Sequence, residues 1–349
     1  MRTPTDKSIR VLVVDDSSLV RTMLARELSA ARDVEVVGFA GDPYEARQRI
    51  LELEPDVVTL DLEMPRMDGL TFLRRLMRHH PIPVVVVSSL TAQGSVLAAE
   101  SLDTGAMSVI CKPGAALSAG EFAEELIAAV RAAAVAHPRS GEPQGSAVAM
   151  PGRAKEGALI AVGASIGGPQ ALQTVLSGMP SDAPPMVVVQ HMPATFTAAF
   201  AACLNVSAAV GVMEARDGDR LVPGKALVAP GDNHITVMRD ASGLFVSVRP
   251  GPLVSSHRPS IDVMMKSVAR VAGSSAVGVL MTGMGHDGAN GLRCLREAGA
   301  ATIVQDEATS VVFGMAKEAL QLEPGHEVAP LGCIAFRALA GAVEAPTRV

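Results

Sequence analysis

The chain has 349 residues, of which 48% are hydrophobic and 19% charged, and its formal net charge is −6. This length predicts two domains, and a chain without basic clusters, without Trp and with one Tyr is not expected to bind nucleic acid. No apolar run is long enough for membrane insertion, the first residues lack a signal-peptide core, and four scattered cysteines fit a reducing, cytoplasmic location.

The first 130 residues alternate short apolar runs with segments of helical spacing. The expected strands are residues 9–14, 34–40, 56–60, 83–87 and 106–111, and the expected helices are 19–28, 43–53, 70–77, 96–103 and 121–134. Such alternation predicts a parallel sheet with helices on both faces. Polar residues directly follow several of these strands, at the edge of a parallel sheet where ligands bind.

These strand-end residues form a chemically coherent set: Asp15, Asp16, Asp61, Ser88 and Lys112. Three carboxylates brought together repel one another unless a cation neutralises them, and an oxygen-binding ion such as Mg²⁺ suits them. A carboxylate beside a metal and a lysine can attack phosphorus and form an acyl phosphate. The alternative is that the Asp pair caps a helix and the Lys-Pro pair marks a loop.

Residues 8 to about 130 resemble a response-regulator receiver domain, which has a flavodoxin-like (βα)5 fold. The resemblance implies that Asp61 accepts phosphate from a chemotaxis histidine kinase, and that Ser88 and Lys112 are the switch residues. Val109 stands three residues before the lysine, where the family usually has an aromatic switch residue. At this position the sequence departs from the aromatic rotamer switch that is usual in the family.

The same resemblance implies a magnesium site that phosphorylation requires. Its ligands would be the carboxylates of Asp16 and Asp61 and the backbone carbonyl of Glu63, with Asp15 acting through water. Residues 131–155 then follow, rich in Pro, Gly and Ser and without apolar periodicity. This composition predicts a flexible tether to a second domain at 156–345.

The second domain is again predicted to be α/β. The expected strands are residues 158–162, 186–190, 226–229, 276–281 and 301–304, and the expected helices are 171–176, 195–204, 261–271 and 289–298. Segments 235–238 and 244–248 predict an antiparallel hairpin, and 211–231 is turn-rich. The pattern favours a doubly wound, mostly parallel sheet with an inserted hairpin.

Residues 163–167, Gly-Ala-Ser-Ile-Gly, lie between the first of these strands and its helix and fit the G-x-S-x-G pattern of a nucleophile elbow. Ser165 would be lifted off the end of the sheet, with helix N–H groups nearby to hold an oxyanion. The alternative is a phosphate-binding or purely structural turn.

A hydrolytic serine needs a base and an orienting carboxylate. His191 follows a buried strand, as Ser165 does, and His257 before a helix is the second candidate base. Asp287 lies at a strand end in a Gly-rich turn, where it could instead form an Asx turn. Four other carboxylates compete for the acid role: Asp217, Asp219, Asp232 and Asp262.

The chain order Ser165, His191, Asp287 differs from that of α/β-hydrolases, in which the acid precedes the His. It matches the catalytic domain of the chemotaxis protein-glutamate methylesterases, the CheB family, which residues 156–345 resemble. The resemblance rests on six stretches of this sequence: residues 163–168, 190–193, 229–234, 257–260, 280–289 and 312–315.

This resemblance places the triad on Ser165, His191 and Asp287, without a cofactor, and an oxyanion hole on the backbone N–H groups of Met284 and Ile166. Ile166 and His286 stand where relatives often carry Thr and Asn. The implied function is a phosphorylation-regulated serine hydrolase that releases methanol from methylated glutamates on chemoreceptor helices and deamidates specific glutamines there.

The rival interpretation is a signalling adaptor whose output domain binds a partner and has lost catalysis. An intact triad argues against it. A kinase or phosphatase is less favoured still, since the sequence has no Gly-x-x-x-x-Gly-Lys loop.

Overall fold

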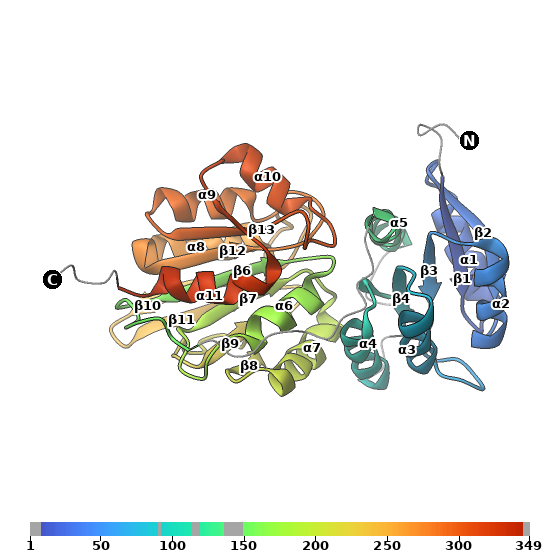
Figure 1. Cartoon of the computed structure of the whole chain (residues 1–349), viewed down its shortest axis with the longest axis horizontal. Helices are drawn as coiled ribbons and strands as arrows, with labels where there is room; N and C mark the ends of the chain where they lie inside the picture. The colour runs from blue at the N-terminus through green and yellow to red at the C-terminus, as the bar shows by residue number, and fades with distance from the viewer. Residues whose placement is uncertain (1–7, 90–91, 113–118, 136–148, 345–349) are drawn as a thin grey trace. The chain divides into compact units, whose positions relative to one another are not determined.

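The computed structural model describes residues 8–89, 92–112, 119–135 and 149–344. The chain divides into two compact units, Met1–Gly141 and Glu142–Val349. Each unit has its own parallel sheet with helices packed around it (Figure 1). No helix among the described residues is long and apolar enough to cross a membrane.

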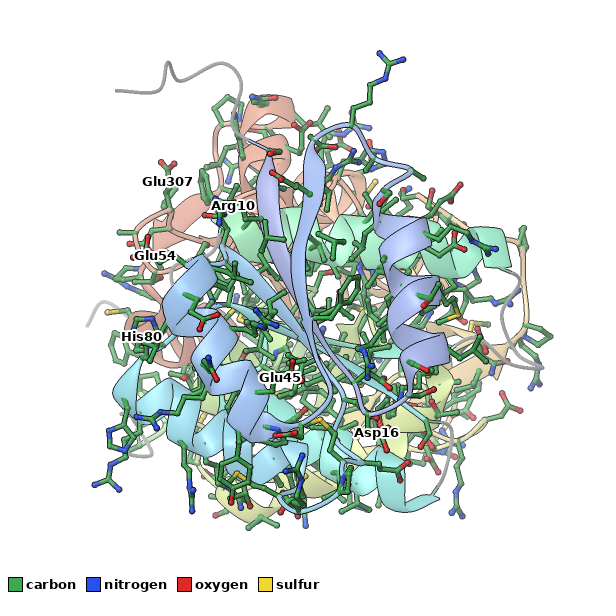
Figure 2. The ribbon with its side chains drawn as sticks, turned by 90° about the vertical axis from the view of Figure 1, so that its right-hand side faces the viewer. Arg10, Asp16, Glu45, Glu54, His80 and Glu307 are labelled. Atoms are coloured by element: carbon green, nitrogen blue, oxygen red, sulfur yellow. The ribbon has the colours of Figure 1, made fainter. Side chains whose placement is uncertain are left out.

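The first unit contains a five-stranded parallel sheet of order β2-β1-β3-β4-β5. Its strands are β1 (Ile9–Val14), β2 (Val34–Ala40), β3 (Val57–Leu60), β4 (Val84–Ser88) and β5 (Ser108–Cys111). Strands β3 and β4 are buried throughout, as parallel strands covered on both faces must be. Arg10 and Asp16, at the two ends of β1, mark opposite ends of the sheet (Figure 2). The strand order is that of the predicted flavodoxin-like fold.

Three helices of this unit begin directly after a side chain that caps them. The helices of the unit are α1 (Ser18–Leu28), α2 (Pro43–Leu53), α3 (Gly69–His79), α4 (Ala92–Thr104) and α5 (Ala119–Val135). Ser17, Asp42 and Asp68 accept hydrogen bonds from backbone N–H groups at the first turns of α1, α2 and α3. These bonds satisfy donors that a helix start leaves without partners.

The second unit contains a seven-stranded sheet of order β14-β13-β12-β6-β7-β9-β8, and every neighbouring pair is parallel. Its strands are β6 (Leu159–Ala164), β7 (Met186–Gln190), β8 (Gly211–Glu214), β9 (Lys225–Val228), β12 (Ala276–Leu280), β13 (Ala301–Gln305) and β14 (Glu327–Ala329). An antiparallel hairpin, β10 (His234–Asp240) and β11 (Gly243–Arg249), forms a separate sheet. The predicted doubly wound fold with an inserted hairpin is confirmed.

Two apolar layers cover the two faces of this sheet. Helices α6 (Gly168–Ser177), α7 (Ala194–Ser207) and α11 (Leu331–Ala342) share one core with Ile160 and Val162. Helices α8 (Ile261–Ala272), α9 (Ala289–Glu297) and α10 (Met315–Leu322) and the hairpin share the other with Leu159 and Ala161. Successive residues of β6 therefore enter opposite cores, as strand geometry requires.

Some elements differ from the sequence-based expectation. The stretch 211–231, expected to be turn-rich around one strand at 226–229, contains that strand as β9 and a further strand, β8, and α10, β14 and α11 were not anticipated. Strand β8 lies at the sheet edge with only Val212 buried, so it lacks the apolar run of a central strand.

The predicted tether, 131–155, is structured at both of its ends. Helix α5 continues to Val135. At the other end, Met150 packs against the core of the second unit, and the Lys155 N–H donates to Ala342 O at 2.9 Å. Residues 136–148, the middle of the predicted tether, lie outside the described residues.

Candidate active site

The site lies where the strand order of the second sheet reverses. From β6 the chain moves outward through β7 to the β8–β9 edge, then crosses back to β12 and continues to β13 and β14. Ser165 directly follows β6, His191 directly follows β7, and Asp287 lies in the loop after β12. Because Ala164 pairs with Gln190 across the two strands, Ser165 and His191 leave the sheet side by side. Such a switch point is where open α/β sheets bind ligands.

The turn that carries Ser165 has no room for larger residues. Gly167 adopts φ +73°, and a Cβ there would lie 2.4 Å from the Cβ of Val311. A Cβ on Gly168 would lie 2.1 Å from Gln190 Oε1. A Cβ atom at either position would clash with these neighbours, so the turn requires both glycines.

Gln190 and Thr282 hold this turn in place, and neither was among the residues predicted for the site. Gln190 Nε2 donates to the carbonyls of Ser165, at 2.8 Å, and His191, at 3.0 Å. Thr282 accepts the Ser165 N–H through its carbonyl at 3.0 Å and donates its hydroxyl to Ile166 O at 2.9 Å. The feature of the sequence that could have identified Gln190 and Thr282 is a polar residue at or directly after the end of a buried strand.

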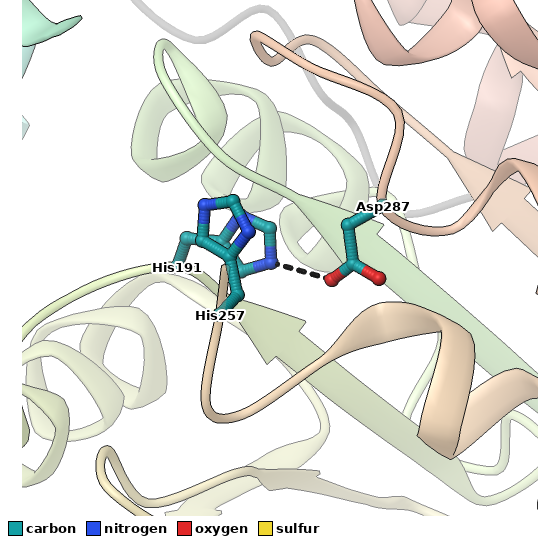
Figure 3. A group of neighbouring side chains, drawn as sticks. All are labelled: His191, His257 and Asp287. Carbon is teal, nitrogen blue, oxygen red and sulfur yellow. Dashed lines mark hydrogen bonds and ion pairs between the residues drawn. The ribbon is translucent and has the colours of Figure 1, made fainter. Parts of the chain in front are cut away.

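His191 and Asp287 are directly hydrogen-bonded. His191 Nε2 lies 2.9 Å from Asp287 Oδ2 (Figure 3). Asp287 also accepts from Ser260 Oγ at 2.8 Å and from the N–H groups of Ile261 and Asp262 at 2.7 and 3.1 Å. Burial raises the pKa of Asp287, but these hydrogen bonds outweigh it and hold the pKa below its usual value. The carboxyl group is therefore ionised at neutral pH and orients the imidazole.

The second ring nitrogen of His191 is available for chemistry. Nδ1 is buried and has no hydrogen-bond partner among the described residues. With its proton on Nε2, facing Asp287, a neutral imidazole presents an acceptor lone pair at Nδ1. Ser165 itself is 7% exposed. The candidate base and the candidate nucleophile are thus both largely shielded from water.

His257, the second candidate base, stacks on His191 with ring centroids 3.7 Å apart and planes 7° apart (Figure 3). Its Nδ1 donates to Ser255 O at 2.6 Å. Burial, together with the neighbouring His191, lowers the pKa of His257 to about 4. His257 therefore remains neutral and supports His191 as a packing partner.

His191, His257 and Asp287 each place a possible metal ligand within 4.8 Å of the others. Two observations favour a hydrogen-bonded relay over a metal centre. The two stacked rings lie in nearly parallel planes, so their in-plane nitrogen lone pairs do not converge on one point between them. Asp287 already accepts four hydrogen bonds, which occupy the roughly four acceptor positions of a carboxylate.

The two candidate oxyanion donors lie on segments that meet at Ser165. A Cβ on Gly283 would lie 2.7 Å from Ser165 Cβ, so the loop after β12 runs against the serine. Met284, the next residue, is exposed, and Ile166 is half-buried beside Ser165.

The four carboxylates that competed with Asp287 for the acid role have other partners. Asp217 pairs with Arg249, Asp219 accepts from Arg216 N–H, Asp232 lies 3.8 Å from Arg258, and Asp262 accepts from Gly288 and Gly291.

The first unit brings its predicted residues together at its own switch point, between β1 and β3. Lys112 Nζ lies 2.7 Å from Asp61 Oδ2 and 2.8 Å from Asp15 Oδ2. Asp15, Asp16 and Asp61 offer oxygens within 4.8 Å of one another. Burial raises the pKa of Asp61, and the nearby Asp15 raises it further, so an added cation would be favourable. This all-oxygen set fits Mg²⁺.

Ser88 and Val109, the residue at the position of the usual aromatic switch, are both buried. Ser88 Oγ has no hydrogen-bond partner within the described part of the chain, and Val109 is 6% exposed. The Glu63 N–H donates to Asp61 Oδ1 at 3.3 Å, so the chain turns directly after the predicted phosphoacceptor.

Fold and site together define a class: a receiver unit followed by an α/β unit with serine, histidine and aspartate at its switch point. Residues 160–337 match the family model described as CheB methylesterase, and residues 11–119 match the response regulator receiver domain. The chain belongs to the CheB methylesterase family.

Relatives cover nearly the whole chain. A protein-glutamate methylesterase/protein-glutamine glutaminase of Anaeromyxobacter dehalogenans is 51% identical, over 94% of this chain and 95% of its own length. One from Syntrophus aciditrophicus is 48% identical, over 94% and 97%. The crystal structure of the Thermotoga maritima CheB methylesterase catalytic domain is 32% identical with a TM-score of 0.52, covering 53% of this chain and 98% of that one.

Proposed function

We propose that this protein removes methyl esters from glutamyl side chains of chemoreceptors and deamidates glutaminyl side chains there, under control of phosphorylation. The observation that carries this function is the His191–Asp287 hydrogen bond beside the Ser165 turn. The family membership supplies the substrate class.

In the proposed mechanism, Ser165 Oγ attacks the ester carbonyl while His191 Nδ1 takes its proton. Asp287 stabilises the resulting imidazolium through Nε2. The tetrahedral oxyanion is held by the backbone N–H groups of Met284 and Ile166. His191 then gives the proton to the leaving methoxide, and methanol departs. Water attacks the acyl-enzyme with the same base, which releases glutamate and restores Ser165. For glutamine, ammonia leaves instead of methanol.

In the receiver, Asp61 would attack the phosphoryl group of a kinase phosphohistidine and form an acyl phosphate. Asp16, Asp61 and the Glu63 carbonyl would hold Mg²⁺, with Asp15 acting through water. Bound there, Mg²⁺ would neutralise the carboxylates and the incoming phosphoryl oxygens. Lys112, between Asp15 and Asp61, supplies a second positive charge.

The test is methanol release from methylated receptor membranes by the full-length protein, with and without a small phosphodonor. We expect release that increases with the phosphodonor and is lost in Ser165→Ala. Binding to receptors without methanol release would favour the adaptor interpretation and contradict the proposed function.

A further inference from the structure

We propose that Asp262 is a positioning residue of the triad, which holds Asp287 against His191 by joining the two helices that begin at the site. This inference rests on the proposed function, because it assigns Asp262 a part in the same hydrolysis.

Helices α8 and α9 cap one another. The first N–H groups of a helix have no partners within it. At the start of α8, the N–H groups of Ile261 and Asp262 donate to the Asp287 carboxylate, at 2.7 and 3.1 Å. At the start of α9, the N–H groups of Gly288 and Gly291 donate to Asp262 Oδ1, at 3.0 and 2.7 Å. Asp262, in the first turn of α8, therefore accepts from the N–H groups at the start of α9. Asp287, just before α9, accepts from the N–H groups at the start of α8.

Asp262 supplies a cap that the sequence before α9 lacks. The N-cap residue of α9 is Gly288, which has φ +95° and no side chain to accept a hydrogen bond. Asp262 is 3% exposed, and its second oxygen lies 3.2 Å from Lys266 Nζ. A carboxyl side chain is buried this deeply only where hydrogen bonds compensate the loss of solvent.

The two helices meet closely at this point. A Cβ on Gly291 would lie 2.7 Å from Met265 Cβ and 3.1 Å from Asp262 Cα. The glycine lets α9 approach α8 until Asp262 can reach the α9 N–H groups. The same contact leaves α9 little freedom to shift along α8 while the cap is intact.

The cap acts on the triad through one peptide unit. The Gly288 N–H, which Asp262 binds, belongs to the amide that directly follows Asp287. Without this bond, the peptide next to the triad carboxylate loses its anchor, and the carboxylate can turn away from His191. A misplacement of about 1 Å in a catalytic group can cost about 100-fold in rate.

The experiment compares Asp262→Ala with Asp262→Asn in the full-length protein. Asparagine keeps an oxygen that can accept from both glycines, whereas alanine removes it. Asn205→Ala is the matched control. Asn205 Oδ1 accepts the Val212 N–H at 2.8 Å near the start of β8, away from the carboxyl edge of the sheet. All variants are assayed for methanol release and for the proton NMR signal of His191 Nε2–H, assigned by its loss in Asp287→Ala.

For Asp262→Ala we expect kcat to fall about 10- to 100-fold with KM unchanged, and the His191 proton signal to shift or disappear. Asp262→Asn should stay within about 3-fold of the parent kcat and keep the signal, since it keeps the acceptor oxygen. Asn205→Ala should lose thermal stability and keep both readouts.

Asp262→Ala with the parent kcat and signal would overturn the inference. It would also be overturned if activity fell only in step with the folded fraction measured by circular dichroism while the signal stayed intact. If the parent protein released no methanol, the proposed function would fail, and the proton signal alone would still test whether Asp262 positions Asp287.

Discussion

His191 and His257 stack face to face, with ring centroids 3.7 Å apart. The two rings cannot both carry a positive charge at this separation without strong repulsion. His257 is therefore the neutral partner, and its pKa is lowered to about 4, chiefly by burial. This relationship makes the stability of the protein depend on pH.

We expect His257 to destabilise the folded protein as the pH falls. An unfolded chain protonates His257 near the ordinary histidine pKa of 6.5, whereas the folded chain does so only near 4. The stability that the folded protein gains from a neutral His257 is thus fully present above pH 6.5. It is lost as the pH falls from 6.5 to about 4. This fall in pKa corresponds to about 3 kcal/mol.

The measurement is urea unfolding of the parent protein and of His257→Phe, which keeps an aromatic ring without a titrating group, between about pH 7 and about pH 4. The difference in unfolding free energy between the two should change by about 3 kcal/mol across this range. His80→Phe, at an exposed position in the first unit, is the control. A constant difference for His257→Phe would refute the neutral-partner interpretation.

Substitution of the triad should separate activity from stability. Ser165→Ala, His191→Ala and Asp287→Ala should each lower methanol release by several orders of magnitude, and the double variants by little more, because the triad acts as a unit. Only Asp287→Ala should also lower the unfolding free energy appreciably, by about 2–4 kcal/mol, since its carboxylate accepts from the first turn of α8. Near-normal turnover by Ser165→Ala would end the serine-hydrolase assignment.

The elbow glycines should tolerate no side chain. Gly168→Ala should inactivate the enzyme, because its Cβ would lie 2.1 Å from Gln190 Oε1, which belongs to the residue that bonds both Ser165 and His191. Gly332→Ala in helix α11 is the control, since nothing lies within 4 Å of its Cβ. It should stabilise the protein by up to about 1 kcal/mol. Normal kinetics in Gly168→Ala would show that the turn can relax.

Phosphorylation should depend on Asp61 and on Mg²⁺. Asp61→Asn should abolish the acid-labile phosphate that a histidine kinase transfers, because it removes the carboxylate, 2.7 Å from Lys112 Nζ, that is proposed to attack the phosphoryl group. Chelation of Mg²⁺ should have the same effect on the parent protein. Label on Asp61→Asn, or label without Mg²⁺, would show that the acidic cluster has another role.

The receiver should restrain the methylesterase until Asp61 is phosphorylated. A tether keeps the two domains at high effective concentration, so even weak docking can limit access to Ser165. A change in docking of about 1–3 kcal/mol would give about 5- to 150-fold activation. We expect the lower end, because Val109 replaces the usual aromatic switch residue.

The measurement compares a fragment beginning at Ala149, which keeps the contacts of Met150 and Lys155 with the second unit, with the full-length protein, with and without phosphodonor. An unphosphorylated full-length enzyme as fast as the fragment would contradict inhibition. A fragment slower than the phosphorylated protein would show that the receiver also activates.

The sequence by itself determined the strands and helices of the receiver and the strand-end positions of Ser165 and His191. Parallel strands buried on both faces are continuous apolar runs, and the polar residue that ends such a run marks the functional edge. The apolar pattern was weaker in elements that lie at the edge of a sheet or that depend on close packing with other elements. Helix α11 contains Gly341, whose absent Cβ would lie 2.9 Å from Ala301 Cβ, so tertiary packing and not helix propensity required that residue.

Only the tertiary structure decided how the site residues face one another. Spacing offered Asp262 and Asp287 as rival acids. The fold gives them different hydrogen-bonding tasks, Asp287 on His191 and Asp262 on the start of α9. The ring nitrogen that His191 presents to Asp287, and the stack with His257, also depend on loops that follow different strands. Side-chain orientation at such a junction is determined by contacts between segments far apart in the chain, which local sequence patterns do not encode.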